Sequence, residues 1–233
     1  MAANLSRPAK AAPGRGSPRL PAHATAGAPA RRGRPANPAV RERILAAALE
    51  LFAEQGYDVT SVSEVVVRAG VTKGALYHYF AAKEDLLYEI YRGHLDVQLA
   101  DLDEILAARE DPATTLFTVI ESLIVTTIRN LPAVTVFGRD MSRLSPERFA
   151  ILQSDWRRYQ DDVRALISAA QQDGTFADAT PELASWMIFG FTNSLPLWYR
   201  PDGPLAATDI AAEFNSLVRA ALDPNRPEGT RSP

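Results

Sequence analysis

The chain has 233 residues, a formal net charge of −3 and no cysteine. Apolar residues make up 46% of it and charged residues 23%, which is enough to build a buried core. Without cysteine, disulfides and zinc sites with thiolate ligands are excluded. The most apolar stretch, residues 183–199, is short for a membrane span and is interrupted by Pro196. We therefore expect a cytoplasmic protein that does not contact a membrane.

The charge is unevenly distributed along the chain. Residues 1–38 contain seven arginines and lysines and no acid, so the remainder carries a net charge of −10. This segment is rich in Ala, Pro and Gly and lacks a periodic apolar pattern, which predicts a disordered basic tail. Residues 224–233 are predicted to be a second disordered tail. The basic tail suits binding to a polyanion; an extension without function is the alternative.

Helical spacing of apolar residues begins directly after the basic tail. Asn37 followed by Pro38 is a favourable start for a helix, and Gly56 ends the pattern that follows. Ser61 and Glu64 have the spacing of a capping box and open a short helix up to residue 70. A further short helix is expected to run from there through residue 80.

Every later segment also has helical periodicity, and none alternates as a strand does. Residues 183–199 are so apolar that the predicted helix there should be buried on nearly every side. We predict an all-α fold of about nine helices, with an N-terminal three-helix helix-turn-helix domain and a C-terminal helical domain. The later helices are expected to start at Lys83, Pro112, Pro132, Pro146, Pro181 and Ala206.

Two short helices that meet at Gly70, preceded by a packing helix, have the layout of a helix-turn-helix. In the second helix Leu76 and Phe80 share an inward face, whereas Lys73 and Tyr77 share another face. A glycine in that helix, at position 74, costs about 1 kcal/mol. Close approach of the backbone to a DNA groove is a plausible compensation. The pattern thus predicts DNA binding by residues 61–80.

Several segments between residues 43 and 95 together resemble the tetracycline-repressor (TetR) family of bacterial transcription regulators. The resemblance implies a homodimer whose recognition helices enter successive major grooves of double-stranded operator DNA, and a variable C-terminal domain that binds a small-molecule effector. The segments that carry it are Ile44-Leu45-Ala46-Ala47-Ala48-Leu49-Glu50-Leu51-Phe52, Gly56-Tyr57, Val71-Thr72-Lys73-Gly74-Ala75-Leu76-Tyr77-His78-Tyr79-Phe80 and Lys83-Glu84-Asp85-Leu86-Leu87.

The resemblance also assigns contacts and domains. The helix-turn-helix domain is expected at 39–99, with its motif at 61–80, and the ligand-binding and dimerisation domain at 100–223. Phosphate contacts are expected from Tyr77, Tyr79 and Lys83. Contacts to bases or the groove are expected from Ser61, Ser63, Thr72, Lys73 and Gly74.

Residues 39–94 contain six basic and eight acidic residues, so DNA binding must depend on a few well-placed cations. Arg34 lies just before the first helix, in the basic run 31–34, where an arm can reach a minor groove. We expect this arm to add affinity more than sequence preference.

An apolar pocket between helices is expected in the C-terminal domain, although several of its candidate residues should belong to the core instead. The segment 189–205, which contains Leu197-Trp198-Tyr199-Arg200-Pro201-Asp202-Gly203-Pro204-Leu205, resembles a subgroup that includes actinobacterial repressors responding to CoA thioesters from lipid or steroid breakdown. The pocket candidates are Phe117, Ile124, Thr127, Phe137, Trp156, Tyr159, Phe189 and Asn193. The dimer candidates are Trp186, Phe191, Phe214 and Leu217.

We therefore interpret the chain as a repressor that a small, largely apolar effector releases from its operator. An activator or ligand-independent regulator with the same DNA-binding domain is the first alternative. An enzyme or carrier that has lost DNA binding is the second; the sequence offers no convergent nucleophile and base for catalysis. No metal or cofactor is expected, because His23, His78 and His94 lack the spacing of metal ligands.

Overall fold

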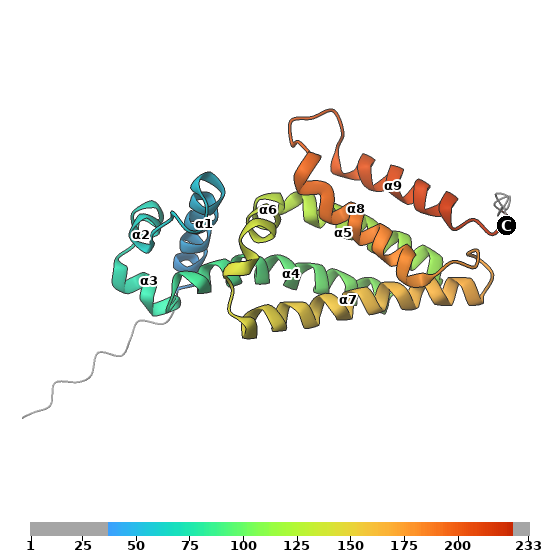
Figure 1. Ribbon diagram of the computed structural model, residues 1–233, viewed down its shortest axis with the longest axis horizontal. Coiled ribbons are helices and arrows are strands. Elements are labelled where there is room, and N and C mark those ends of the chain that lie inside the picture. Colours follow the sequence, from blue (N-terminus) through green and yellow to red (C-terminus); the bar gives the residue numbers. More distant parts are fainter. Residues whose placement is uncertain (1–36, 226–233) are drawn as a thin grey trace, which may run out of the picture. The chain divides into compact units, whose positions relative to one another are not determined.

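The computed structural model describes residues 37–225, and these form nine α-helices, one short 3-10 helix and no strand (Figure 1). The all-α prediction is confirmed for this part of the chain. The two predicted tails lie outside the described residues, apart from positions 37–38 and 224–225. The helices are α1 (Pro38–Gln55), α2 (Val62–Ala69), α3 (Lys73–Tyr79), α4 (Lys83–Ala107), α5 (Pro112–Arg129), α6 (Leu131–Asp140), the 3-10 helix η1 (Met141–Arg143), α7 (Pro146–Gln172), α8 (Pro181–Trp198) and α9 (Ala207–Ala221).

Side-chain caps fix the starts of the first three helices. The Asn37 side chain accepts a hydrogen bond from the amide of Ala39 at the start of α1. Ser61 and Glu64 form the predicted capping box at α2, with hydrogen bonds of 2.7 and 3.2 Å. Because α2 ends at Gly70 in the left-handed conformation, the chain turns there directly into α3.

The helix α4 belongs to both halves of the fold. It contacts α1 near its beginning and α5, α6 and α7 further along (Figure 1). The predicted domain boundary at residues 99–100 lies inside this unbroken helix. The later helices and α1 therefore contact the same continuous helix.

In the C-terminal half α5 is the central helix, in contact with α4, α6, α7, α8 and α9. Leu116, Ile120 and Ile124 of α5 are fully buried. Within residues 37–225 no single helix has the length and apolar composition of a membrane span. The segments Pro112–Arg129 and Leu131–Arg143 have this length and composition only when taken together, and they are bent by 82° relative to each other. Buried core helices can have the same length and composition.

The helix α8 departs from its prediction of burial on nearly every side. Ile188 and Leu195 on one face are fully buried, but Leu183 and Trp186 are each 60% exposed. The prediction was wrong for the single chain, because composition does not tell a face covered by the same chain from a face left open. The result is an apolar surface on α8.

Candidate DNA-binding face and ligand cavity

The helix α3 buries one face and leaves another open, as its sequence predicts. Leu76 and Phe80 are buried against the core of α1, α2 and α4. On the other face the Lys73 ammonium lies 5.9 Å from the centroid of the Tyr77 ring. A Cβ atom placed on Gly74 would meet nothing within 4 Å. This part of α3 therefore has room for another surface to approach its backbone.

The hydroxyl groups expected to contact DNA lie at the starts of α2 and α3. Ser61 Oγ accepts a hydrogen bond from the Glu64 amide, and Thr72 Oγ1 accepts one of 3.1 Å from the Ala75 amide. Each hydroxyl acts as an acceptor in its cap and retains its own proton for an outside acceptor. Ser63 is exposed on α2. The caps therefore position these side chains without using their donors.

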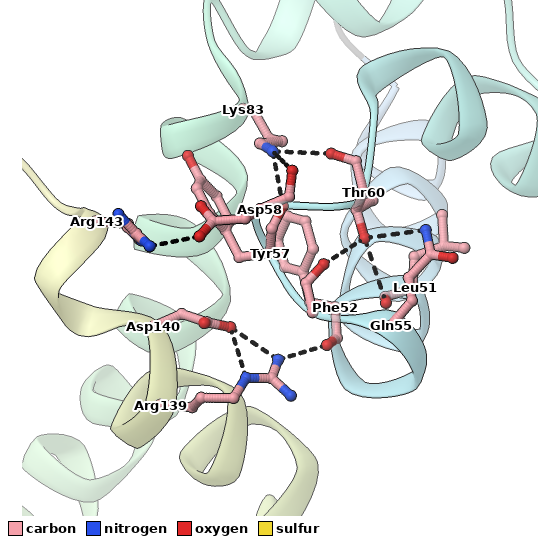
Figure 2. Close-up of polar contacts among 11 residues, drawn as sticks. Leu51, Phe52, Gln55, Tyr57, Asp58, Thr60, Lys83, Arg139, Asp140 and Arg143 are labelled. Atoms are coloured by element: carbon pink, nitrogen blue, oxygen red, sulfur yellow. Dashed lines mark hydrogen bonds and ion pairs between the residues drawn. The ribbon is translucent and has the colours of Figure 1, made fainter.

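Tyr79 and Lys83, both expected to contact phosphates, are engaged within the chain. The Tyr79 hydroxyl accepts a hydrogen bond of 2.7 Å from the Asn37 amide at the start of α1. The Lys83 ammonium donates to the carbonyls of Tyr57 and Thr60 at 2.7 and 2.8 Å (Figure 2). It also lies 4.2 Å from the centroid of the Tyr57 ring. In this structure Tyr79 joins α3 to the start of α1, and Lys83 joins the start of α4 to the loop between α1 and α2.

Only some of the cations near the helix-turn-helix are paired with carboxylates within residues 37–225. Arg41 and Arg68 form ion pairs with glutamates of α4 and α1. Lys73 and Arg43 are exposed and take part in no ion pair within residues 37–225. They can neutralise phosphates without losing a protein partner. Arg34 lies outside the described residues.

A cavity of about 620 Å³ lies among α4, α5, α6, α7 and α8. Its floor is buried and includes His94, Gln98 and Tyr159. Its mouth is formed by exposed residues of α6 and α8, among them Arg139 and Asn193. The predicted pocket residues that line it are Thr127, Phe137, Trp156, Tyr159, Phe189 and Asn193.

Phe117 and Ile124, also predicted for the pocket, belong to the core instead. Phe117 packs edge-on against Phe176 and under the Arg219 guanidinium, which lies 4.0 Å from the ring centroid. Ile124 is fully buried on α5. Because α5 is surrounded by other helices, most of its apolar residues face neighbouring helices and only a few face the cavity.

Aromatic rings form one wall of the cavity. Tyr91 stacks on Phe137 with ring centroids 3.6 Å apart, and Trp156 meets both rings edge-on. The Trp156 indole also donates a hydrogen bond of 3.1 Å to the Tyr91 hydroxyl. Burial raises the pKa of Tyr91 to about 12. The wall is thus uncharged at neutral pH and suited to a flat or aliphatic apolar group.

Neutral polar groups form the cavity floor. Gln98 donates a hydrogen bond of 3.1 Å to Thr127 Oγ1. His94 is 5% exposed, its Nδ1 atom has no partner among the described residues, and burial lowers its pKa to about 4. Burial also raises the pKa of Tyr159. At neutral pH the floor therefore carries no charge, and Arg139 is the only charged residue among those that line the described cavity.

Comparison with known protein families identifies both halves of the chain. Residues 44–90 match the family described as "Bacterial regulatory proteins, tetR family", and residues 109–222 match "Tetracyclin repressor-like, C-terminal domain". The HTH-type transcriptional repressor KstR2 of Rhodococcus jostii strain RHA1 is 31% identical over 188 residues, which cover 78% of this chain and 90% of that protein. The chain belongs to the TetR family.

Solved structures of this family have the same fold. The ketosteroid transcriptional regulator KstR2 of Mycobacterium tuberculosis is 26% identical, with a TM-score of 0.72, over 78% of this chain and 94% of that one. AibR in complex with isovaleryl coenzyme A and operator DNA is 24% identical, with a TM-score of 0.69, over 80% of this chain and 98% of that one. This TetR-family chain is therefore a helix-turn-helix transcription regulator.

The predicted dimer residues of this TetR-family regulator fall into two groups. Trp186 on α8 and Leu217 on α9 are exposed. Phe191 and Phe214 stack on each other, with ring centroids 3.9 Å apart, and Phe214 is 6% exposed. This second pair joins α8 to α9 within the chain and leaves little of Phe214 for a partner.

Sequence reasoning missed the cavity residues on α4, and on α6 it found Phe137 but not Arg139. Tyr91, His94 and Gln98 lie on α4, within the part of the chain expected to form the DNA-binding domain. Their spacing of three and four residues along one helix face was the available signal. Arg139, at the end of α6, had no sequence signal that distinguishes it from other arginines.

Proposed function

We propose that this TetR-family regulator is a homodimeric repressor that a largely apolar small molecule releases from its operator. The observation that carries the proposal is that α3 has an open face and that an aromatic-walled cavity lies beside α4. The helix α4 connects the DNA-binding half to this cavity. A ligand in the cavity touches the helix that also packs against α1. The relative KstR2 bears the name of a transcriptional repressor, which supports this direction of control.

DNA recognition is proposed to come from the open face of α3 and the starts of α2 and α3. Lys73 supplies the free cation, Tyr77 lies beside it, and Gly74 leaves room for the groove. Ser61, Ser63 and Thr72 donate from hydroxyl groups. Tyr79 and Lys83 act chiefly by holding α1 and the loop before α2. As a protein that binds DNA in a bacterial family, it is expected to act in the cytoplasm.

Dimerisation is proposed to involve the apolar surface of α8 together with α9. Leu183, Trp186 and Leu217 are large apolar side chains left exposed by the single chain. An exposed apolar surface of this kind is typical of an interface with a second copy. In such a dimer the two α3 helices would enter successive major grooves of DNA, about 34 Å apart.

The proposed ligand is a CoA thioester or a related catabolite of lipids or steroids. The structural relative AibR was solved in complex with isovaleryl coenzyme A, and the relative KstR2 is described as a ketosteroid transcriptional regulator. The cavity fits an acyl or ring group of this kind, because its wall is aromatic and its floor is uncharged. Such a ligand shifts the balance between two states only by its different affinity for them. The ligand must therefore favour a state whose α3 helices do not match successive grooves.

Selection from a pool of random DNA tests the DNA-binding part of the proposal. The expected product is a palindromic sequence whose retardation in gels weakens when isovaleryl coenzyme A is added, with coenzyme A alone as the control. Lys73→Ala should lower the affinity for the selected sequence. If no sequence is enriched, the proposal that the protein binds a specific operator is wrong. Enrichment without release by any acyl-CoA would leave a regulator that does not respond to this ligand class.

A further inference from the structure

Arg139 occupies a position shared by the ligand cavity and the DNA-binding half. It lies near the end of α6, at the exposed mouth of the cavity, and its side chain is 45% exposed. One terminal guanidinium nitrogen (Nη2) donates a hydrogen bond of 2.6 Å to the carbonyl of Phe52 in the last turn of α1 (Figure 2). The same guanidinium pairs with Asp140. A group that binds Arg139 from the cavity side therefore acts directly on the end of α1.

The end of α1 leads into the loop that positions α2. Phe52 itself is fully buried in the core of the DNA-binding half, and its carbonyl also accepts the hydrogen bond from the Gly56 amide that closes α1. A cation at the carbonyl end of a helix is stabilising, because it satisfies a carbonyl and opposes the helix dipole. Arg143 extends the connection by pairing with Asp58 in the loop (Figure 2). Displacement of Arg139 would alter the support of this helix end and of the loop.

The chemistry of the cavity indicates which ligand group would reach Arg139. Apart from this guanidinium the lining of the described cavity is uncharged, and its aromatic wall and buried floor suit an apolar body. A charged head group would lose its hydration in the buried part of the cavity, so it is expected to stay at the exposed mouth. The second terminal nitrogen (Nη1) of Arg139 makes no hydrogen bond within residues 37–225, so the guanidinium has a free donor. A carboxylate that uses both terminal nitrogens competes with the Phe52 carbonyl.

We propose that Arg139 binds an anionic or carbonyl oxygen of an amphiphilic ligand whose apolar body fills the cavity, and thereby gives up its hydrogen bond to Phe52 at the end of α1. This inference rests on the proposed function, since it names the ligand group and the residue that couple cavity and DNA. It assigns to one side chain both the recognition of the ligand head group and the transmission to the DNA-binding half.

The ligand part is tested without DNA, by comparing decanoate with decan-1-ol in thermal unfolding of the full chain. The two probes have the same alkyl chain but differ in the head group. Decanoate should raise the unfolding temperature more than decanol does, and this difference should disappear in Arg139→Gln. The control is Arg129→Gln, since Arg129 is exposed on α5, does not line the cavity and forms no ion pair within the described residues. Equal effects of the two probes, or no effect of either, would overturn the ligand assignment.

The coupling part is tested with the selected operator. Without ligand, Arg139→Gln should weaken operator binding about fivefold, because it removes the support of α1, whereas Arg129→Gln should not. Decanoate should weaken operator binding by the native chain by about the same factor and have no further effect on Arg139→Gln. A merely structural role for Arg139 predicts that decanoate still weakens binding by that variant, which would overturn the coupling. Because the thermal measurement uses no DNA, failure of operator selection leaves the ligand result standing.

Discussion

The ammonium of Lys83, the first residue of α4, lies 2.7 Å from the carbonyl oxygen of Tyr57, 26 residues earlier in the chain. It donates to the Thr60 carbonyl as well, and it lies over the Tyr57 ring (Figure 2). The Thr60 hydroxyl in turn donates a hydrogen bond of 2.7 Å to the Gly56 carbonyl. One cation thus ties the loop after α1 to the start of α4, so that the entry to the helix-turn-helix depends on both helices.

Replacing Lys83 separates this positioning role from a contact with DNA phosphate. Lys83→Met should lower the free energy of unfolding by about 1–2 kcal/mol, because it removes hydrogen bonds from a charged group to partly buried carbonyls. Urea unfolding followed by circular dichroism measures this change. Lys73→Met is the control and should leave stability nearly unchanged, since Lys73 is exposed. On operator DNA the order reverses: Lys73→Met should reduce the slope of log affinity against log salt by about one, and Lys83→Met by less. Equal stability of the two variants would contradict the positioning role.

The arginines before α1 are expected to strengthen DNA binding by charge alone. Replacing Arg31, Arg32 and Arg34 together with Gln keeps the length of the tail and removes three positive charges. Operator affinity should fall, and its dependence on salt should become flatter by up to about three units of slope. Relative affinities among operator variants should stay the same, because phosphate contacts carry no sequence information. Deletion of residues 1–36 should have at least as large an effect, and an unchanged salt slope in both chains would exclude the tail from DNA binding.

The parts of the fold that sequence could predict are those set by neighbouring residues. The capping box of Ser61 and Glu64, the end of α2 at Gly70 and the inward face of α3 follow from spacing over a few positions, and the structure confirms them. The aromatic residues at the cavity were partly predictable, because Trp156 and Phe189 lie on strongly apolar or amphipathic helices.

Relationships between distant residues were not predictable in this way. Arg139 and Phe52 are 87 positions apart, and only the packing of α6 against α1 brings them together. The spacing of the histidines in the sequence could only argue against a metal site at His94. That His94 is buried depends on the packing of α4 against a cavity that four other helices also line. Ile124 shows a further limit, because apolar composition does not tell a core residue from a pocket residue.

The exposed apolar surface of α8 is expected to hold two copies together. Trp186→Glu places a charge at this surface in both copies and should raise the dissociation constant of the dimer at least about tenfold. Sedimentation velocity over a range of concentrations measures it, and circular dichroism should show unchanged helix content because Trp186 is 60% exposed. Val67→Glu is the matched control, since Val67 is 80% exposed on α2, away from this surface. A Trp186→Glu chain that sediments as the native one does would place the interface elsewhere.

His94 is expected to make the stability of the chain depend on pH between about 6.5 and 4. Burial holds its pKa near 4 in the folded chain, against 6.5 when it is exposed, so the unfolded chain binds a proton more readily in this range. Stability therefore falls as pH falls, and this one group should account for a loss of about 2 kcal/mol between pH 7 and pH 5.

Carboxylates also titrate near pH 5, so the contribution of His94 must be taken as a difference between chains. His94→Gln cannot take up a proton, and its loss of stability between pH 7 and pH 5 in urea unfolding should be smaller than that of the native chain by about 2 kcal/mol. His78→Gln is the control, because it makes the same replacement at an exposed histidine on α3, away from the cavity. Parallel pH profiles for the native and His94→Gln chains would mean that His94 is protonated equally in the folded and unfolded states.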